Sequence, residues 1–330
     1  MKKQSIAIIG GGSWATGIAK LVLNNTDHIN WFIYEKEIID HIRKHHHNPK
    51  YLSTVEFDPK KITFFNNVKE AIENSTLIIL VVPSAYIKDT FGKEKIDFTG
   101  RFLVNASKGI VGGDNITITQ YFQKKFHLTD SQVGIISGPS HAEEIAMERM
   151  TYLSCAAKND KDAEMIATAI RQWYIKTVIS NDVLGVEYGA VLKNIYAISV
   201  GIAHGLGYGD NFTAVLVSNA IRETERFLSK VFHHDRHLFH SAYLGDLLVT
   251  AYSQFSRNRS FGNMIGKGYS VKATMMEMSQ IAEGYYSTKC ISEINKEMNV
   301  KMPIATAVYD ILYKGVSPAT AFNELTEKLK

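Results

Sequence analysis

The stretch that decides the fold of the first half of the chain is Ser5-Ile6-Ala7-Ile8-Ile9-Gly10-Gly11-Gly12-Ser13-Trp14-Ala15-Thr16. Its first five residues are an apolar, β-branched run, the pattern of a strand buried on both faces. Three glycines follow directly, and the apolar spacing of residues 17–23 then predicts a helix. Together they form a G-x-G-x-x-A pattern in the strand–turn–helix context of a dinucleotide-binding fingerprint.

Each small residue of this turn has a predicted role. Gly10 permits the tight turn, Gly12 lets the backbone approach a pyrophosphate, and Ala15 permits close packing of helix on strand. The N-terminus of the helix then offers N–H donors and the positive end of its dipole. We therefore predict a dinucleotide site here. The alternative is a glycine turn that joins a strand to a helix and binds no ligand.

A second strand is predicted over residues 29–34, and Glu35 follows it. An acid about 20 residues after the glycine turn binds the ribose 2′-hydroxyl of NAD in this fold. Lys36 is the next residue, and a lysine there is able to meet the 2′-phosphate of NADP instead. The sequence therefore leaves NADH and NADPH both open as the cofactor. The alternative for both side chains is a solvated strand end.

Further buried strands are predicted over residues 77–82, 102–107 and 135–137, with a last one over 177–180. These runs end in small polar residues, and ligands of an open parallel sheet bind at the carboxyl ends of its strands. We therefore expect Lys108 and the run Gly138-Pro139-Ser140 to face the same crevice as the glycine turn. The alternative for Lys108 is a surface loop, where most lysines lie.

From residue 187 onward the pattern is helical, and residues 187–197 read as one helix. On it Lys193 shares a face with small residues, including Gly189 and Ala197. Burial there would lower the pKa of Lys193, which suits proton transfer near neutral pH. The alternative is a lysine that reaches water from a buried helix. The sequence thus predicts an α/β Rossmann-type domain over residues 1–186 and an all-α domain over residues 187–330.

A second cluster of polar residues lies within residues 245–259. As a helix, this stretch carries on one face Asp246, Thr250 and Ser253. The run Ser256-Arg257-Asn258 then forms a donor-rich helix end, in which Arg257 offers a planar fork for a phosphate. An acid, a hydroxyl and a phosphate-binding arginine suit a small phosphorylated alcohol. The alternative is a capped helix end with a surface ion pair.

The composition excludes several classes of protein. Hydrophobic residues make up 45% of the chain and charged residues 21%, which is ordinary for a globular protein. A net charge of +4 argues against a nucleic-acid partner and permits a small anionic substrate. Cys155 and Cys290 lie far apart without metal-ligand spacing, so we expect a reducing, cytoplasmic setting. We expect neither a signal peptide nor a membrane span.

Two histidine-rich segments invite a metal prediction, and we expect no metal at either. Adjacent histidines in residues 45–47 point in different directions on a helix, and no carboxylate lies at helical spacing. The second segment, residues 233–240, offers no clear partner beyond Asp235. We expect it to be solvated and distant from the substrate.

The chain resembles bacterial NAD(P)-dependent glycerol-3-phosphate dehydrogenase. The resemblance rests on short runs that occur in order over nearly the whole chain. They are the Gly10 turn with Ser13-Trp14, His47-Asn48-Pro49-Lys50-Tyr51-Leu52, Val82-Pro83-Ser84, Lys108-Gly109, Gly138-Pro139-Ser140-His141-Ala142-Glu143, Leu192-Lys193-Asn194, Asp246-Leu247, Ser256-Arg257-Asn258 and Glu283-Gly284.

The resemblance implies reversible reduction of dihydroxyacetone phosphate to sn-glycerol 3-phosphate with NADH or NADPH, supplying glycerophospholipid synthesis. It also implies that Lys193 exchanges the proton at the substrate oxygen. We expect Arg257 and Asn258 to bind the substrate phosphate, the helical half to form a homodimer, and the site to hold no metal. The positions that match the family's substrate site are Lys108, Gly138, Ser140, Lys193, Asp246, Ser256, Arg257 and Asn258. Those that match its nucleotide site are Ser13, Trp14, Lys108, Ala142, Arg257, Ile281 and Glu283, beside Gly10, Gly12 and Glu35 of the fingerprint.

Three positions depart from the family pattern. Ala15 replaces the usual glycine, Tyr34-Glu35-Lys36 stands where basic residues are common, and residues 241–244 replace a glycine-rich lead into Gly245-Asp246. Two other functions remain open on the residues alone. One is a two-domain dehydrogenase of a non-phosphorylated hydroxy acid, which would not need Ser256-Arg257-Asn258. The other is a nucleotide sensor that has lost the chemistry, against which Lys193, Asp246 and Arg257 all speak.

Overall fold

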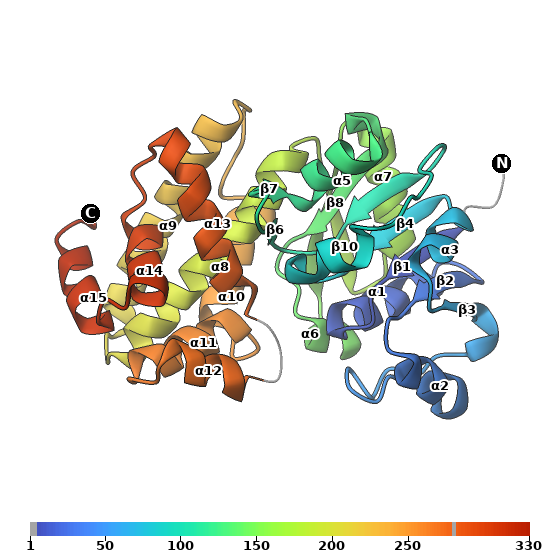
Figure 1. The fold of residues 1–330 in the computed structure, drawn as a ribbon, viewed down its shortest axis with the longest axis horizontal. Helices are drawn as coiled ribbons and strands as arrows, with labels where there is room; N and C mark the ends of the chain where they lie inside the picture. The colour runs from blue at the N-terminus through green and yellow to red at the C-terminus, as the bar shows by residue number, and fades with distance from the viewer. Residues whose placement is uncertain (1–4, 279–281) are drawn as a thin grey trace. The chain divides into compact units, whose positions relative to one another are not determined.

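The computed structural model describes residues 5–278 and 282–330 and divides the chain into two compact units (Figure 1). The first unit runs to Ser107 and resumes over Ile118–Val183. The second unit holds Lys108–Thr117 and Leu184–Lys330. The sequence placed the boundary after residue 186 and gave no sign that the segment 108–117 joins the helical unit. Lys108 therefore belongs to the same unit as Lys193.

The first unit is built on an eight-stranded sheet in the order β10-β9-β8-β5-β4-β1-β2-β3. All neighbours pair in parallel except β8 and β9, which are antiparallel. Six neighbouring strands, in the order β3-β2-β1-β4-β5-β8, have the arrangement of a doubly wound dinucleotide-binding fold. The switch point of that fold lies between β1 and β4. The strands are β1 (Ile6–Ile9), β2 (Ile29–Phe32), β3 (Ile62–Phe65), β4 (Leu77–Leu80), β5 (Phe102–Asn105), β8 (Val133–Ser137), β9 (Thr151–Ala157) and β10 (Ile175–Ser180).

Helices connect these strands and bury the sheet. Every residue of β1 and β4 is buried, as expected for central parallel strands covered on both faces. The sequence predicted six of the eight strands and missed β3 and β9. The helices of this unit are α1 (Ser13–Leu23), α2 (Lys36–His45), α3 (Val68–Glu73), α4 (Ile87–Phe91), α5 (Ile118–Phe126), α6 (Ala142–Ala146) and α7 (Asp160–Ile170), with short 3-10 turns at Pro59–Lys61, Ser84–Tyr86 and Asp130–Gln132.

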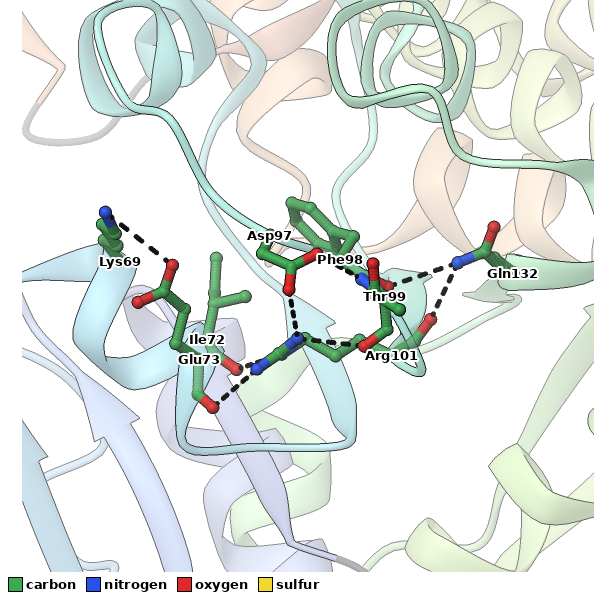
Figure 2. A network of polar contacts seen from close by, with 8 residues as sticks. All are labelled: Lys69, Ile72, Glu73, Asp97, Phe98, Thr99, Arg101 and Gln132. Atoms are coloured by element: carbon green, nitrogen blue, oxygen red, sulfur yellow. Dashed lines mark hydrogen bonds and ion pairs between the residues drawn. The ribbon is translucent and has the colours of Figure 1, made fainter.

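Arg101 fastens the end of α3 to the start of β5 (Figure 2). Its guanidinium donates to the carbonyl oxygens of Ile72 at 3.1 Å and of Glu73 at 2.8 Å. These are carbonyls of the last turn of α3, which have no partner within the helix. Gln132 adds bonds to the carbonyls of Phe98 and Arg101 from the turn before β8. The network joins α3 and the turn before β8 to the segment that leads into β5.

The second unit is helical apart from a small antiparallel hairpin, β6 (Ile110–Val111) and β7 (Ile116–Thr117). Its long central helix α8 is buried at every residue from Gly185 to Ala203. By length and composition α8 could cross a membrane, which the sequence analysis had not expected of any run, but 89% of its apolar window is buried inside the protein. The helices are α8 (Val183–Gly205), α9 (Asp210–Val231), α10 (Asp246–Tyr252), α11 (Arg257–Gly266), α12 (Val271–Glu277), α13 (Glu283–Met298), α14 (Pro303–Lys314) and α15 (Pro318–Thr326), with a π-helical turn at Ser241–Gly245.

Helices α8 and α11 approach each other closely because glycines line their contact. A Cβ on Gly201 of α8 would overlap the carbonyl oxygen of Arg259, and a Cβ on Gly262 of α11 would overlap that of Ile198. Arg259 and Gly262 meet Gly201 and Ile198, whereas Gly266 meets Ile202 and Gly205, so the two helices run in the same direction. The N-terminus of α11 is therefore directed toward the Lys193 end of α8. The Rossmann-type first domain and the helical second domain predicted from the sequence are confirmed.

Candidate active site

The glycine turn has the geometry that the fingerprint requires. Gly10 has φ +135°, and a Cβ there would lie 2.5 Å from the carbonyl oxygen of Val81 on the neighbouring β4 side. A Cβ on Gly12 would meet nothing within 4 Å, so the backbone at Gly12 is open to a ligand. Gly12 is also the N-cap of α1 and has no side chain to cap it. These features fit a dinucleotide, whose pyrophosphate would lie against Gly12 and the first turn of α1.

Asn48 holds this turn in place, a role that the sequence did not reveal. Its buried amide group donates to the carbonyl oxygen of Gly11 at 3.1 Å and to Oγ1 of Thr16 at 3.0 Å. Its Oδ1 accepts from the backbone N–H groups of Lys50 at 3.0 Å and Tyr51 at 3.2 Å. The carboxamide of Asn48 therefore joins the glycine turn, α1 and its own loop. A run quoted for the family resemblance contained Asn48, but nothing in its spacing indicated this contact.

Two tryptophans also fix the turn. Nε1 of Trp31, a buried residue of β2, donates to the carbonyl oxygen of Gly10 at 2.8 Å. Nε1 of Trp14 on α1 donates to the carbonyl oxygen of Ala106 at 2.9 Å, in the loop that follows β5. The indole N–H of Trp14 is thus engaged within the protein, and only its ring is available to a nucleotide. Ser13 is buried at the first position of α1.

The other residues predicted in the first unit lie at the carboxyl ends of its strands. Glu35 follows β2, and its Oε2 lies 3.6 Å from where a Cβ on Gly11 would stand. Gly138 follows β8 with φ +122°, and its carbonyl oxygen accepts a bond from Oγ of Ser140 at 2.9 Å. Ala142 is the first residue of α6 and is buried. Gly12, Glu35 and Gly138 therefore lie just after the carboxyl ends of β1, β2 and β8.

In the second unit, Lys193, Asp246 and Lys108 form one charged cluster. Asp246 is fully buried at the start of α10, and Nζ of Lys193 on α8 donates to its Oδ1. Nζ of Lys108 lies 3.5 Å from the other carboxylate oxygen, Oδ2. Three segments that are far apart in the sequence thus converge on one carboxylate. When both lysines are protonated, they share a single negative charge, and the cluster then carries a net positive charge that favours an anionic ligand.

Burial and this arrangement shift the acidity of Lys193. The side chain of Lys193 is 6% exposed. Burial lowers its pKa from the ordinary 10.5 to about 7, with a further lowering from the positive charge of Lys108 and opposition from Asp246. An amine with this pKa exchanges protons readily near neutral pH.

The polar residues after Asp246 differ from the expected single helix. Helix α10 ends at Tyr252, and Ser253 lies outside it, so the predicted face of Asp246, Thr250 and Ser253 is wrong at its last member. Oγ1 of Thr250 donates to the backbone oxygen of Asp246 at 2.6 Å. Ser256 is the N-cap of α11, where its Oγ accepts the backbone N–H of Arg259 at 3.3 Å.

The N-terminus of α11 lies beside the residue that follows Lys193. Oδ1 of Asn258 accepts the backbone N–H of Gly284 at 2.9 Å, at the first turn of α13. A Cβ on Gly284 would lie 2.7 Å from the carbonyl oxygen of Asn194 and 2.8 Å from Oδ1 of Asn258. Asn258 and Asn194 are therefore close neighbours. Arg257 is the exposed first residue of α11, at the positive end of the helix dipole.

Glu283, a position of the predicted nucleotide site, is the first residue of α13, and Ala282 is the N-cap of that helix. Ile281, which the resemblance placed in the nucleotide site, lies outside the described residues.

The first histidine segment, residues 45–47, forms a cluster with His41. His41, one turn before His45, lies with Nε2 3.3 Å from Nε2 of His47, and the rings of His41 and His45 are 4.5 Å apart. Within residues 5–278 and 282–330, no group of three or more His, Cys, Asp or Glu side chains has the arrangement of a metal site.

Family models match both halves of the chain. The model described as the N-terminus of NAD-dependent glycerol-3-phosphate dehydrogenase matches residues 5–163, and that of the C-terminus matches residues 182–323. The chain belongs to the NAD-dependent glycerol-3-phosphate dehydrogenase family. The resemblance drawn from the sequence is thereby confirmed.

Relatives in this family match over the whole chain. Glycerol-3-phosphate dehydrogenase (NAD(P)+) of Bacillus cytotoxicus is 33% identical over 328 residues, which cover 98% of this chain and 96% of the relative. The structure of glycerol-3-phosphate dehydrogenase from Coxiella burnetii is similar with a TM-score of 0.91 and 29% identity, over 98% of this chain and 99% of that one. The Saccharomyces cerevisiae enzyme shares the fold, with a TM-score of 0.83 and 22% identity, over 98% and 99% of the two chains.

Proposed function

We propose that the protein catalyses the reversible reduction of dihydroxyacetone phosphate to sn-glycerol 3-phosphate. The convergence of Lys193 and Lys108 on Asp246 is the observation that carries this proposal. The N-terminus of α11 lies near Asn194, the residue that follows Lys193. This arrangement combines a proton donor with a positively charged place for a phosphate. The matching relatives carry this activity in their names, and the glycine turn of the first unit fits the cofactor.

Lys193 acts as the proton donor in reduction. When bound, the reduced nicotinamide cofactor would provide the hydride for this reduction. As negative charge develops on the carbonyl oxygen, the ammonium group of Lys193 gives its proton to that oxygen and becomes a neutral amine. The reverse reaction needs the neutral amine as the base. Asp246 orients Lys193, and Lys108 adds positive charge next to the developing alkoxide.

Arg257 holds the phosphate of the substrate. Its exposed guanidinium offers a bidentate fork, and the helix dipole of α11 favours a negative charge at the same end. Asn258, whose Oδ1 is bound to Gly284, has its amide NH2 group left as a donor for the same anion. We place Gly138, Ser140 and Ser256 in the substrate site, and Glu283, Ala142, Ser13 and the ring of Trp14 in the nucleotide site, as the family pattern implies.

We propose that NADH is preferred to NADPH. The carboxylate of Glu35 lies over the glycine turn, where it is able to accept the ribose hydroxyls of NADH and would repel the 2′-phosphate of NADPH. Lys36, the alternative phosphate partner, is the exposed first residue of α2. The kcat/KM for NADH should exceed that for NADPH. Glu35→Ser should lower the ratio of kcat/KM for NADH to kcat/KM for NADPH by about tenfold, which is equivalent to one lost hydrogen bond. A wild-type preference for NADPH contradicts this assignment.

An absorbance assay with purified protein tests the function. NADH oxidation is expected with dihydroxyacetone phosphate and not with plain dihydroxyacetone, which separates the proposal from a dehydrogenase of non-phosphorylated hydroxy acids. Lys193→Ala should lower kcat by about 10²- to 10⁴-fold, whereas Arg257→Ala should mainly raise the KM for the triose phosphate. Absence of any oxidation with dihydroxyacetone phosphate and either nucleotide overturns the proposal and favours a nucleotide sensor.

We further propose that the protein is a cytoplasmic homodimer that supplies glycerophospholipid synthesis. The product carries the glycerol phosphate unit of those lipids. Light scattering on the purified protein tests the dimer, and a monomeric mass would contradict it.

A further inference from the structure

Two contacts, one helical turn apart, join α8 to the segment that carries Asp246. Lys193 binds Asp246, and four residues earlier on the same face of α8, Gly189 faces the ring of Tyr243. A Cβ on Gly189 would lie 3.0 Å from Cδ1 and 3.3 Å from Cε1 of that ring. The absence of a side chain at Gly189 therefore lets the ring lie directly against the helix.

Tyr243 lies in a segment whose shape sets the position of Asp246. It is the middle residue of the π-helical turn Ser241–Gly245, which leads without a break into α10 and Asp246. Its ring is buried, and its backbone N–H donates to the oxygen of His240 at 3.0 Å. A π-helical turn is rare and is frequently found at functional sites. Packing of the Tyr243 ring on Gly189 is a contact between this turn and α8.

We propose that Tyr243 is a positioning residue for proton transfer: its ring, packed on Gly189, fixes Asp246 along α8 so that the carboxylate meets Lys193. This inference rests on the proposed role of Lys193. Gly189 and Lys193 are one turn apart on α8, and Tyr243 and Asp246 are three residues apart on the facing segment. A shift of the π-helical turn on α8 would therefore move the carboxylate away from the amine.

The charges around Lys193 predict how such a shift is detected. Asp246 from α10 favours the charged amine, whereas Lys108 from the segment before β6 and the burial of Lys193 disfavour it. If Asp246 moves away, the pKa of Lys193 falls. The pH above which reduction slows then falls as well, because a smaller share of Lys193 is protonated.

The test compares Tyr243→Phe, Tyr243→Leu, Gly189→Ala and the double variant Gly189→Ala/Tyr243→Leu with the wild type. Single-turnover reduction of dihydroxyacetone phosphate is measured from pH 5.5 to 9.5. Tyr243→Phe keeps the ring on Gly189, so its inflection should lie closer to that of the wild type than the inflection of Tyr243→Leu does. Tyr243→Leu and Gly189→Ala should each lower the rate by about ten- to a hundredfold, as for a small misplacement of a catalytic group, and move the inflection to lower pH. In the double variant the two effects should be less than additive, because both act on one contact.

Tyr188→Leu is the matched control. Tyr188 is a buried residue of α8 next to Gly189, and the centroid of its ring lies 5.4 Å from that of Phe227 on α9. It should lose thermal stability to a similar degree as Tyr243→Leu and keep the wild-type inflection. An unchanged inflection in Tyr243→Leu, or the same shift in Tyr188→Leu, overturns the positioning role. Failure of the wild type to reduce the triose phosphate would instead overturn the proposed function, so the two failures are distinct.

Discussion

Replacing Lys108 with methionine should move the pH dependence of reduction to higher pH. Lys108 and Lys193 bind different oxygens of Asp246, with Nζ of Lys108 3.5 Å from Oδ2. Lys108 is one of the causes that lower the pKa of Lys193. Removing its charge therefore raises that pKa and keeps Lys193 protonated, and active in reduction, to higher pH.

The size of the shift follows from the geometry of the shared carboxylate. Two ammonium groups on its two oxygens lie about 5 Å apart, and at an effective dielectric constant of about 20 they repel each other by about 3 kcal/mol. The side chain of Lys108 is 20% exposed, so solvent screening reduces this by roughly half. The remainder corresponds to a rise of about one unit in the pKa of Lys193.

The assay is single-turnover reduction of dihydroxyacetone phosphate, followed by the absorbance of NADH at saturating substrate, so that product release does not mask proton transfer. Asp246→Asn provides the opposite perturbation and should move the inflection to lower pH. Lys314→Met is the matched control, since Lys314 pairs with Asp310 at 2.8 Å on the surface of α14. An inflection that stays in place or moves to lower pH in Lys108→Met would refute the electrostatic reasoning.

Three further predictions concern binding and stability. Asn48→Ala removes the buried amide that holds the glycine turn, so it should raise the KM for NADH about tenfold and lower the free energy of unfolding by about 2–4 kcal/mol. The KM for the triose phosphate should stay the same, and equal changes in both KM values would contradict this role. Gly262→Ala forces α11 away from α8 and should lower the free energy of unfolding, measured with denaturant, by about 3 kcal/mol or more. Gly268→Ala is the control: Gly268 has a positive φ but no atom near its Cβ position, so this variant should lower the free energy of unfolding by less. Burial raises the pKa of Glu223 to about 7, so between pH 4.5 and 7 the folded protein keeps a proton that the unfolded chain releases. The free energy of unfolding of the wild type should therefore fall relative to that of Glu223→Gln over this interval, by at most about 1.4 kcal/mol per pH unit. A constant difference between the two proteins over this interval would be inconsistent with the shift.

Local patterns were sufficient for the first unit because its chemistry is contiguous in sequence. The strand, glycine turn and helix from Ser5 to Leu23 lie next to each other along the chain, and backbone conformation at Gly10 depends on near neighbours. Strands β3 and β9 were missed because their side chains alternate less clearly. Phe64 and Phe65 in β3 are only half buried, and Tyr152 in β9 is exposed.

Helix boundaries around Asp246 were predicted less well. The run from Gly245 to Arg259 has helical spacing throughout, yet helix α10 ends at Tyr252 and a new helix, α11, begins at Arg257. Ser256 and Arg257 therefore lie at the N-terminus of α11, where the helix dipole favours an anion. The sequence had suggested that they lie at the far end of the helix that carries Asp246. Packing of α11 on α8 through Gly201 and Gly262 decides this geometry, and those glycines are far apart in the sequence.

The sequence by itself determined the dinucleotide fold, the helical second half and the residue types of the site, because periodicity, glycine spacing and side-chain chemistry are local properties. Only the tertiary structure decided that Lys108 leaves the first unit to share Asp246 with Lys193, that Asn48 holds the glycine turn, and that Tyr243 packs on Gly189. Each of these contacts joins residues 37 or more positions apart. Their partners are chosen by packing and by the cost of leaving a buried charge or amide unpaired, and neither is a property of any single stretch of the chain.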